Sequence, residues 1–384
     1  MARQIHRPVA GPPRVLLLVD ALAKNGATVI TLTLARRWAC DGARLAVLQR
    51  LPDLAAMTPS PEVAVDNLTA RPTRLRYSLP LAVPRLIATV RRAEVVVNCS
   101  EIGIALPLGF LAARATRKPF VVAVHQDLDD ALNEWTARRL HRLFRWIHRR
   151  VDGAICVAPA LVAPLVRNGL APDRITVVTN GIDVDETRRA GQGAGSLIVD
   201  DGVPAVVATG RLAAAKGTEL LIEAHARVVR ELPHRVLLLN DGPERERLRE
   251  LTAQLGVESS VQFAGAVRNP LPTVASAFVF CLPSRSEGLP LALLEAMALG
   301  VPSIAADCAE GVRAALDDGR VGALVPVNDI DALAQALARH LRDPRPLRLL
   351  AERGPTHART FDIDVMARGW ASALRDVVDG RRRS

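Results

Sequence analysis

The sequence predicts two doubly wound α/β domains in tandem, each built on a parallel β-sheet with helices on both faces. The chain has 384 residues, which is more than a single hydrophobic core usually serves. Short apolar runs rich in β-branched residues recur along it, with room for a helix between one run and the next, as in buried parallel sheets. A glycine-rich stretch at 190–196 separates two series of these runs and indicates a change of domain. We therefore expect domains at 1–188 and 189–362, followed by a terminal segment at 363–384.

Each expected strand is an apolar run bounded by polar or turn-forming residues. Ligands of doubly wound sheets bind where the strands end, so the loops that follow strands should carry the function, and the two sheets should face each other across a cleft. The expected strands cover 14–19, 44–48, 94–98, 120–124, 154–157 and 175–178 in the first domain, and 205–208, 235–239, 261–263, 277–281, 303–305 and 323–325 in the second.

Charge is distributed unevenly along the chain, whose formal net charge is +10. Residues 1–180 hold 25 Lys and Arg against 13 Asp and Glu, which leaves 25 against 27 for the remainder. A basic half suits nucleic acid, an anionic membrane surface or a phosphorylated substrate. Aromatic residues make up only 3% of the chain and no groove-reading or RNA-binding motif is recognisable, so we expect no nucleic-acid partner.

The cysteines and the apolar stretches predict the compartment. Five scattered cysteines with no C-x-x-C pair indicate a reducing compartment, and neither a disulfide framework nor a zinc site is expected. The longest uncharged apolar stretch, 102–113, is shorter than the roughly 20 residues that cross a bilayer. We expect a cytoplasmic protein, with peripheral attachment to the inner face of the cell membrane left open.

The stretch 281–300 begins as a strand and ends as a helix. Glu287 would lie in the turn before the helix and Glu295 in its second turn, while the N–H groups of Gly288 and Leu289 would point the same way and suit an anion. The alternative is that Glu287 only favours the helix dipole and that Glu295 is a solvated side chain. Because Glu295 lies among apolar residues, we prefer a bound sugar hydroxyl as its partner.

Arg211 and Lys216 follow the first strand of the second domain, beside Gly210 and Gly217. Two cations held at this position neutralise a diphosphate without a metal ion. The alternative is a solvated basic loop. No acidic metal-binding motif occurs, so neither a metal nor a cofactor is expected.

Several motifs together resemble those of the family 4 retaining glycosyltransferases, the glycosyl transferases group 1, which have the GT-B fold of two Rossmann-like domains. The resemblance covers about residues 14 to 375. Its motifs are Ser286-Glu-Gly-Leu-Pro290 with Glu295-Ala-Met297, similar to the family's E-x7-E signature, Thr209-Gly-Arg-Leu212 with Lys216-Gly217, similar to its G-R-L…K-G element, and Asn180-Gly-Ile-Asp183, similar to its N-G-x-D element.

The resemblance implies roles for these residues. Arg211 and Lys216 would bind the donor pyrophosphate and stabilise the leaving nucleotide. Glu295 would hold the ribose hydroxyls, while Glu287 and the backbone at 288–289 would hold the transferred sugar. The donor-binding positions so implied are Gly26, Asn180, Gly210, Gly288, Leu289 and Glu295.

In the first domain, His125 ends a strand. A lone histidine is more often structural, but this one is similar to the family's histidine that faces the donor sugar, so we expect it to contact the transferred sugar or the acceptor. Gly26 is the counterpart of a glycine-rich loop that approaches the donor phosphates. The chain departs from the family pattern at Asn25, Thr28, Ala158, Asn240 and Ala314, positions that bear on acceptor choice and sugar contacts.

Two further segments bear on partners. Residues 135–150 combine six arginines with apolar side chains and predict a basic amphipathic helix, either lying on an anionic membrane or forming an ordinary surface helix. A helix at about 365–378 crosses back onto the first domain by resemblance, and the tail at 381–383 should be solvated.

The predicted function is transfer of a hexose-type sugar from a nucleoside diphosphate sugar to an acceptor hydroxyl, with retention of configuration implied by the resemblance. The acceptor would be a glycan, a glycolipid or another cell-envelope precursor. One alternative is a nucleotide-sugar epimerase, or a phosphorylase, of the same architecture. Another is a non-catalytic partner that has lost turnover, which the departures from the family pattern motivate.

Overall fold

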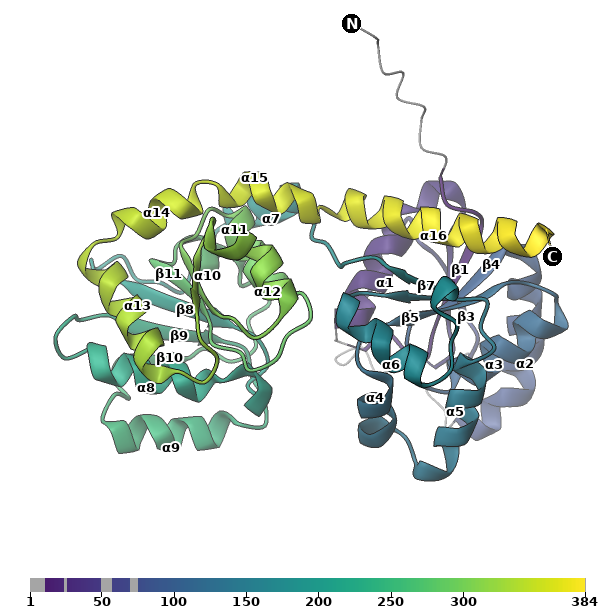
Figure 1. Ribbon diagram of the computed structural model, residues 1–384, viewed down its shortest axis with the longest axis horizontal. Helices are drawn as coiled ribbons and strands as arrows, with labels where there is room; N and C mark the ends of the chain where they lie inside the picture. The colour runs from purple at the N-terminus through teal and green to yellow at the C-terminus, as the bar shows by residue number, and fades with distance from the viewer. Residues whose placement is uncertain (1–10, 24–25, 50–56, 70–74, 384) are drawn as a thin grey trace, which may run out of the picture. The chain divides into compact units, whose positions relative to one another are not determined.

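The computed structural model describes residues 11–23, 26–49, 57–69 and 75–383, and the chain in it forms two compact units (Figure 1). The first consists of Met1–Asn180 with Asp364–Ser384, and the second of Gly181–Ile363. The chain thus changes unit ahead of the glycine-rich stretch 190–196, whose first residues end a helix of the second unit. Lys24 and Asn25 lie outside the described residues.

The first unit contains a seven-stranded, wholly parallel sheet in the order β3-β2-β1-β4-β5-β6-β7. Chain order reverses between the neighbours β1 and β4, so the loops that follow these two strands diverge there. The strands are β1 (Val15–Val19), β2 (Arg44–Val47), β3 (Ala64–Asn67), β4 (Val95–Asn98), β5 (Phe120–Val124), β6 (Gly153–Cys156) and β7 (Ile175–Val177).

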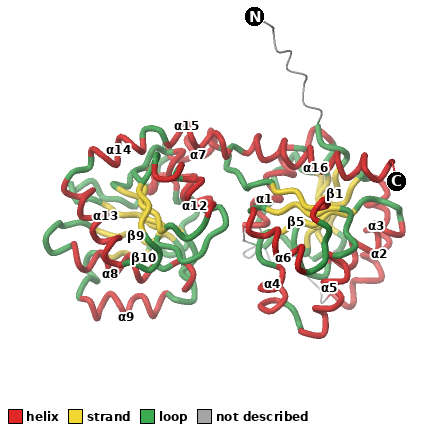
Figure 2. Tube along the Cα trace, in the orientation of Figure 1, coloured by secondary structure: helices red, strands yellow, loops and turns green. Residues whose placement is uncertain are grey.

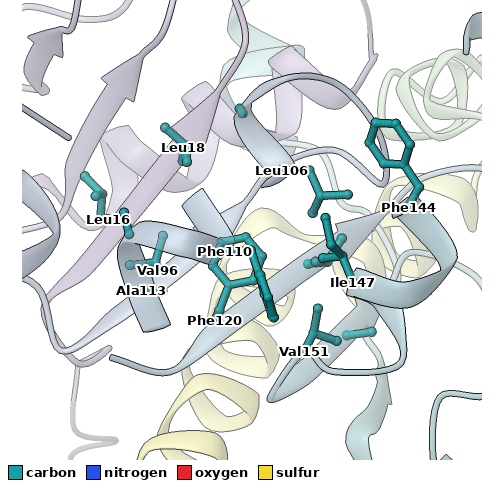
Figure 3. Close-up of a cluster of buried hydrophobic side chains, with 14 of the residues drawn as sticks. Leu16, Leu18, Val96, Leu106, Phe110, Ala113, Phe120, Phe144, Ile147 and Val151 are labelled. Atoms are coloured by element: carbon teal, nitrogen blue, oxygen red, sulfur yellow. The ribbon is translucent and has the colours of Figure 1, made fainter. Parts of the chain in front are cut away.

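Helices cover both faces of this sheet (Figure 2), and alternate strand residues feed the two faces. Leu16 and Leu18 of β1 pack into a core with Phe110 and Phe120, whose rings meet edge to face with centroids 5.8 Å apart (Figure 3). The helices are α1 (Gly26–Arg37), α2 (Leu75–Arg92), α3 (Ala105–Ala115), α4 (Leu128–Trp135), α5 (His141–His148), α6 (Val162–Arg167) and α16 (Ile363–Arg383).

The second unit repeats this architecture with a six-stranded parallel sheet in the order β10-β9-β8-β11-β12-β13, and its chain order reverses between β8 and β11. Its strands are β8 (Ala205–Thr209), β9 (Arg235–Leu239), β10 (Val261–Phe263), β11 (Val279–Leu282), β12 (Ser303–Ala306) and β13 (Ala323–Val325). Its helices are α7 (Val184–Gly191), α8 (Thr218–Val228), α9 (Arg245–Leu255), α10 (Leu271–Ala275), α11 (Leu291–Ala298), α12 (Glu310–Ala315), α13 (Ile330–Arg342), α14 (Arg345–Ala351) and α15 (Gly354–Ala358).

Alternation along the strands again builds two cores, one on each face of the sheet. Val206, Val236 and Val279 belong to the cluster that includes buried residues of α8 and α13. Val207 and Phe280, their neighbours in the strands, belong to the cluster that includes α11 and α12. Both faces are therefore apolar, which explains why the strands read as continuous apolar runs.

Every expected strand is present within two residues of its predicted ends, and one strand was missed. Strand β3, with the sequence Ala-Val-Asp-Asn, lies at the edge of the first sheet, and none of its residues is fully buried. A short, half-exposed edge strand needs no continuous apolar run, so it lacks the pattern by which the others were identified.

The prediction of one basic helix over 135–150 was wrong. Helix α4 ends at Trp135, Thr136 has extended backbone, and α5 begins only at His141 after a short 3₁₀ turn at Arg138–Leu140. Arg138 and Arg139 lie in the 3₁₀ turn, and only Arg142 and Arg145 lie within α5, so the six arginines do not share one helical face.

The prediction of a solvated tail at 381–383 was wrong for Arg381. Helix α16 continues to Arg383, and the Arg381 guanidinium donates to the Lys118 carbonyl at 2.7 Å and to the Asp152 carboxylate at 3.1 Å. A side chain at Gly153 would meet Val377 of α16 at 2.9 Å, which shows how closely this helix packs on the first unit.

Candidate active site

The loop that follows β8 carries Gly210, Arg211 and Lys216, where the order of the second sheet reverses. Gly210 has φ +135°, a backbone conformation that residues with a Cβ rarely adopt. Further along, Gly217 has φ +58°, and a Cβ there would lie 2.3 Å from the Pro283 carbonyl oxygen. The loop after β8 therefore packs directly on the loop after β11, and glycine is required at this contact.

Lys216 and Glu287 form an ion pair across these two loops. The Lys216 Nζ lies 2.8 Å and 2.9 Å from the two carboxylate oxygens of Glu287, and the buried Ser284 hydroxyl donates to Oε1 at 2.7 Å. The Glu287 side chain is 9% exposed and that of Lys216 is 34% exposed. The carboxylate is thus held from two sides, while the Lys216 side chain keeps partial exposure to solvent and so remains able to meet an anion.

Two features of this pair were not predicted. The sequence placed Lys216 and Glu287 at one site but did not predict direct contact between them. The two residues are far apart in the chain, and only the packing of two loops brings them together. Ser284 was missed altogether. Its position, two residues after a buried strand and three residues before Glu287, was the feature by which the sequence could have identified it.

Arg211 is exposed, and among the described residues no partner is recorded for its guanidinium. Its neighbour Leu212 is buried, and the Leu212 N–H donates to the Asp241 carbonyl at 3.1 Å, which anchors the loop on the turn after β9. The backbone at Arg211 is therefore held while its charged side chain stays available.

Helix α11 begins at Leu291, with Pro290 as its N-cap, so Glu295 is its fifth residue. Burial raises the pKa of the Glu295 carboxyl to about 7, and no donor to it is found within the described part of the chain. The N–H groups of Gly288 and Leu289, in the turn before α11, also have no recorded acceptor among the described residues. The turn thus offers two free donors, and the helix a half-buried carboxyl without a partner.

The turn at 288–289 is packed from behind by the first turn of α12, the helix that follows β12. A Cβ at Gly311 would lie 1.9 Å from the Gly288 carbonyl oxygen, so this contact requires glycine. Asp307, in the loop between β12 and α12, pairs with Arg313 of α12 at 2.6 Å and 2.8 Å. Ala314, where the family has glutamate, lies in α12.

In the first unit, a cavity of about 190 Å³ lies where β1 and β4 diverge, with Asp20, Thr28, Asn98 and Ser100 among its lining residues. Burial raises the pKa of Asp20, whose carboxylate accepts the Ala105 N–H at 2.8 Å. Asp20 was not singled out in the sequence, although an acidic residue directly after an apolar strand was a signal. Gly26 begins α1, where a side chain would meet nothing within 4 Å.

His125 follows β5 and is held by the loop after β4. Its backbone N–H donates to a carboxylate oxygen of Glu101 at 3.1 Å, and its ring hydrogen-bonds the Cys99 backbone. Burial lowers the pKa of His125 to about 4, so the ring is neutral at pH 7. With one ring nitrogen directed at a backbone carbonyl, the other is left as an acceptor.

The remaining predicted positions lie outside these groups. Asn180 is the last residue of the first unit, and its buried side-chain oxygen has no hydrogen-bond partner among the described residues. Ala158 is the second residue after β6. In the turn after β9, the Asn240 side-chain oxygen accepts the Asp241 N–H at 2.8 Å.

A cavity of about 820 Å³ in the second unit lies at the other end of the sheet, where β9 and β10 begin. It contains none of the candidate residues, so we assign the site from the charged and unpaired groups and not from cavity size. Within 11–23, 26–49, 57–69 and 75–383, no group of three or more His, Cys, Asp or Glu side chains is arranged to hold a metal ion.

Comparisons with known proteins cover both halves of the chain. Residues 15–186 match the family described as Glycosyltransferase Family 4, and residues 203–343 match the family described as Glycosyl transferases group 1. A D-inositol 3-phosphate glycosyltransferase from Kribbella flavida is 28% identical over 92% of this chain and 91% of its own length.

Other relatives are matched over only part of their length. An exopolysaccharide phosphotransferase from Streptomyces coelicolor is 34% identical over 178 residues, which are 46% of this chain and 19% of that protein. Further relatives are matched over about half of their own length.

The fold is shared with solved structures. HepE from Anabaena, in a structure of its complex with UDP, has a TM-score of 0.75 over 94% of this chain and 100% of HepE, at 20% identity. With a family match on each half and two parallel-sheet units in the observed order, this chain belongs to the group 1, family 4 glycosyltransferases and has the GT-B fold.

Proposed function

We propose that this glycosyltransferase moves a hexose-type sugar from a nucleoside diphosphate sugar to an acceptor hydroxyl, with retention of the anomeric configuration. The observation that carries the proposal is the preformed Lys216–Glu287 pair beside the partnerless carboxyl of Glu295. A cation and a held carboxylate on two adjoining loops, with a free carboxyl in the helix that follows one of them, match the three parts of such a donor: diphosphate, sugar and ribose.

In the proposed complex, Arg211 and Lys216 contact the diphosphate, and Gly26, Asn180 and Gly210 contribute to the donor site. Glu295 accepts hydrogen bonds from the ribose hydroxyls. Glu287, with the N–H groups of Gly288 and Leu289, orients the transferred sugar. His125 contacts that sugar or the acceptor through its unprotonated ring nitrogen.

The reaction breaks the bond between the anomeric carbon and the diphosphate oxygen and forms one to the acceptor oxygen, whose proton passes to the departing diphosphate. The protein's contribution is to hold cations where negative charge grows and to hold the acceptor on the face that the diphosphate leaves. No further co-reactant is required.

A thermal-shift panel tests the donor assignment. Wild-type protein is heated with UDP, GDP, ADP, dTDP and the corresponding sugars, because a ligand that binds only the folded state raises the melting temperature. We expect one nucleoside diphosphate and its sugars to raise it, and Lys216→Ala to diminish the shift. If no member of the panel raises the melting temperature at millimolar concentration, donor binding is refuted.

Incubation of the wild-type protein with its donor and no acceptor separates the reaction classes. A transferase only hydrolyses the donor slowly, whereas an epimerase converts it into another nucleotide-sugar. Release of the free sugar in the α or β form, followed by NMR, then tests retention directly.

We further propose that the acceptor is borne on an anionic membrane at the cytoplasmic face, a location that the five unpaired cysteines suit. Among the described residues no helix is long and apolar enough to cross a bilayer, so attachment would be peripheral. The surface for it is formed by α3 and α5, two helices in contact with each other.

This α3–α5 surface is defined by exposed Leu111, Leu143 and Trp146 with the exposed Arg142, and it is extended by exposed Arg139 of the 3₁₀ turn that precedes α5. Leu111 is 62% exposed and Trp146 44% exposed. Trp146 is supported from below, since its ring centroid lies 5.7 Å from that of the buried Phe110. Apolar side chains among arginines suit the boundary between acyl chains and anionic headgroups.

Vesicle flotation tests the α3–α5 surface. We expect wild-type protein to float with vesicles containing phosphatidylglycerol more than with phosphatidylcholine alone, and less as salt rises. The double variant Arg139→Glu/Arg142→Glu should lose binding, while Arg230→Glu/Arg353→Glu in the second unit, with the same charge change, should keep it. Equal loss in both variants, or no flotation of the wild type, refutes the membrane proposal.

A further inference from the structure

Glu101 is a buried acidic residue that no motif of the sequence singled out. It lies in the loop between β4 and α3 and is 4% exposed. Burial raises the pKa of its carboxyl, and among the described residues no cation is paired with it. An acidic side chain in such a place is costly to retain unless hydrogen bonds to its carboxylate hold it.

Two donors to the Glu101 carboxylate come from the start of the loop after β5, and a third is the backbone N–H of Glu101 itself. The first two are the His125 backbone N–H at 3.1 Å and the Gln126 side chain. The carboxylate thus holds the chain at the point where β5 ends and His125 begins.

The His125 ring is held by the same loop. Its hydrogen bond to the Cys99 backbone comes from two residues before Glu101, so the loop after β4 contacts both the backbone and the ring of His125. Two contacts on one residue restrict the position of its Cα and the rotation of its ring together.

Glu101 is itself anchored by α5. The buried His148, the last residue of that helix, donates from Nε2 to the Glu101 carbonyl oxygen at 2.7 Å. His148 is 1% exposed and burial lowers its pKa to about 4, so this contact does not change near neutral pH. The loop that holds His125 is therefore tied to a second packed element.

We propose that Glu101 is a positioning residue for the transfer reaction, which sets His125 in the orientation that meets the sugar or the acceptor. The proposal rests on the proposed function, because it requires His125 to contact a reactant. Glu101 itself touches no reactant in this proposal. A displacement of His125 by about 1 Å is enough to cost on the order of 100-fold in rate.

The test is a double-mutant cycle between Glu101 and His125 with the donor that the thermal-shift panel selects. Glu101→Ala should lower kcat by roughly 10- to 100-fold, while the affinity for the nucleoside diphosphate, bound by the second unit, stays unchanged in calorimetry. Glu101→Gln, whose oxygen still accepts from the His125 N–H, should recover most of the rate. In the His125→Ala background, Glu101→Ala should cost nothing further.

Glu134→Ala, at an exposed glutamate of α4 in the same unit, is the matched control and should keep the wild-type kcat. If Glu101→Ala does not fold, Glu101→Asp takes its place in the cycle. A wild-type kcat in the Glu101 variant, or losses that add independently to those of His125→Ala, would overturn the positioning role. If His125→Ala keeps full activity while Lys216→Ala loses it, the positioning proposal fails and the proposed function stands; if the wild type turns over no nucleotide-sugar, both fail.

Discussion

At the scale of single residues, the two cations of the donor site differ in how they are held. Lys216 is fixed by Glu287 at 2.8 Å, whereas Arg211 is exposed with no recorded partner among the described residues. We expect Lys216→Ala and Arg211→Ala each to lower turnover, on the order of 100-fold, because each removes a charge facing the departing diphosphate. Steady-state kinetics measure this, with Arg230→Ala as a control, and wild-type rates in both variants would contradict the assignment.

The two glutamates should affect different kinetic constants. Glu295→Gln should raise the donor KM with less effect on kcat, because a ribose contact exists before and during reaction. Glu287→Gln should depress kcat and leave affinity for the free nucleoside diphosphate nearly unchanged. Steady-state kinetics of both variants measure KM and kcat, and calorimetry measures their affinity for the nucleoside diphosphate. The division of roles is wrong if Glu287→Gln abolishes nucleotide binding and Glu295→Gln does not.

Glu295 also predicts a pH dependence of donor binding. Burial raises its pKa to about 7, and ribose hydroxyls donate best to the ionised carboxylate. Donor affinity should therefore fall as pH drops through 7, where the carboxyl becomes protonated in the free protein. Calorimetric titrations of the nucleoside diphosphate between pH 5.5 and 8.5 measure this. In Glu295→Gln the dependence over this range should flatten, and an unchanged slope there would exclude Glu295 as its source.

At the scale of elements, α8 is joined to β9 and β10 by a buried histidine pair. His225 of α8 lies 2.8 Å from His234, nitrogen to nitrogen, and 2.7 Å from the Ser260 hydroxyl oxygen. His234 contacts the Leu232 carbonyl at 2.6 Å, which requires its Nδ1 to be protonated. It follows that His225 donates from Nδ1 to His234. The Ser260 hydroxyl lies 2.7 Å from His225 Nε2 and 3.1 Å from the Val257 carbonyl oxygen, and its single hydrogen can be given to His225 Nε2 only while that ring is neutral.

This network predicts acid sensitivity of the second unit. Burial lowers the pKa of His225 from its usual 6.5 to about 3, so the unfolded chain binds more protons between these values. The free energy of unfolding should thus fall as pH drops below 6.5, on the order of 2 kcal/mol by pH 4. Urea unfolding at pH 4 and pH 8 measures this loss of unfolding free energy. The loss should be smaller in His225→Gln and unchanged in His357→Gln. Equal losses in the wild type and both variants would exclude the histidine network as the cause of the acid sensitivity.

At the scale of the whole molecule, each unit has its own sheet and its own buried clusters. Units with separate cores can unfold separately, and the second carries the proposed charged side chains for the diphosphate and the ribose, whereas the first contributes only Gly26 and Asn180 to the proposed donor site. We expect calorimetry to resolve two unfolding transitions, of which the nucleoside diphosphate raises one. Lys216→Ala should remove that increase without shifting the other transition. Equal increases in both transitions would contradict the assignment of the main donor contacts to the second unit.

The sequence predicted the order of strands and helices because each buried strand is apolar on both faces and therefore forms a continuous apolar run in the sequence. The same property hid β3, whose half-exposed residues form no such run. The continuous helix expected over 135–150 failed for a related reason: apolar periodicity continued through Thr136, while the backbone turned there.

The sequence by itself determined the α/β class, the positions of the buried strands and the loops that carry Arg211, Lys216, Glu287, Glu295 and His125, because all of these follow from local pattern and motif. Only the tertiary structure decided which groups meet. The Lys216–Glu287 pair and the contact of Glu101 with His125 each join loops that follow different strands, while Ser284 supports Glu287 from within the same loop. Such contacts depend on the order of strands in a sheet and on the close packing of loops, neither of which leaves a periodic signal in the chain.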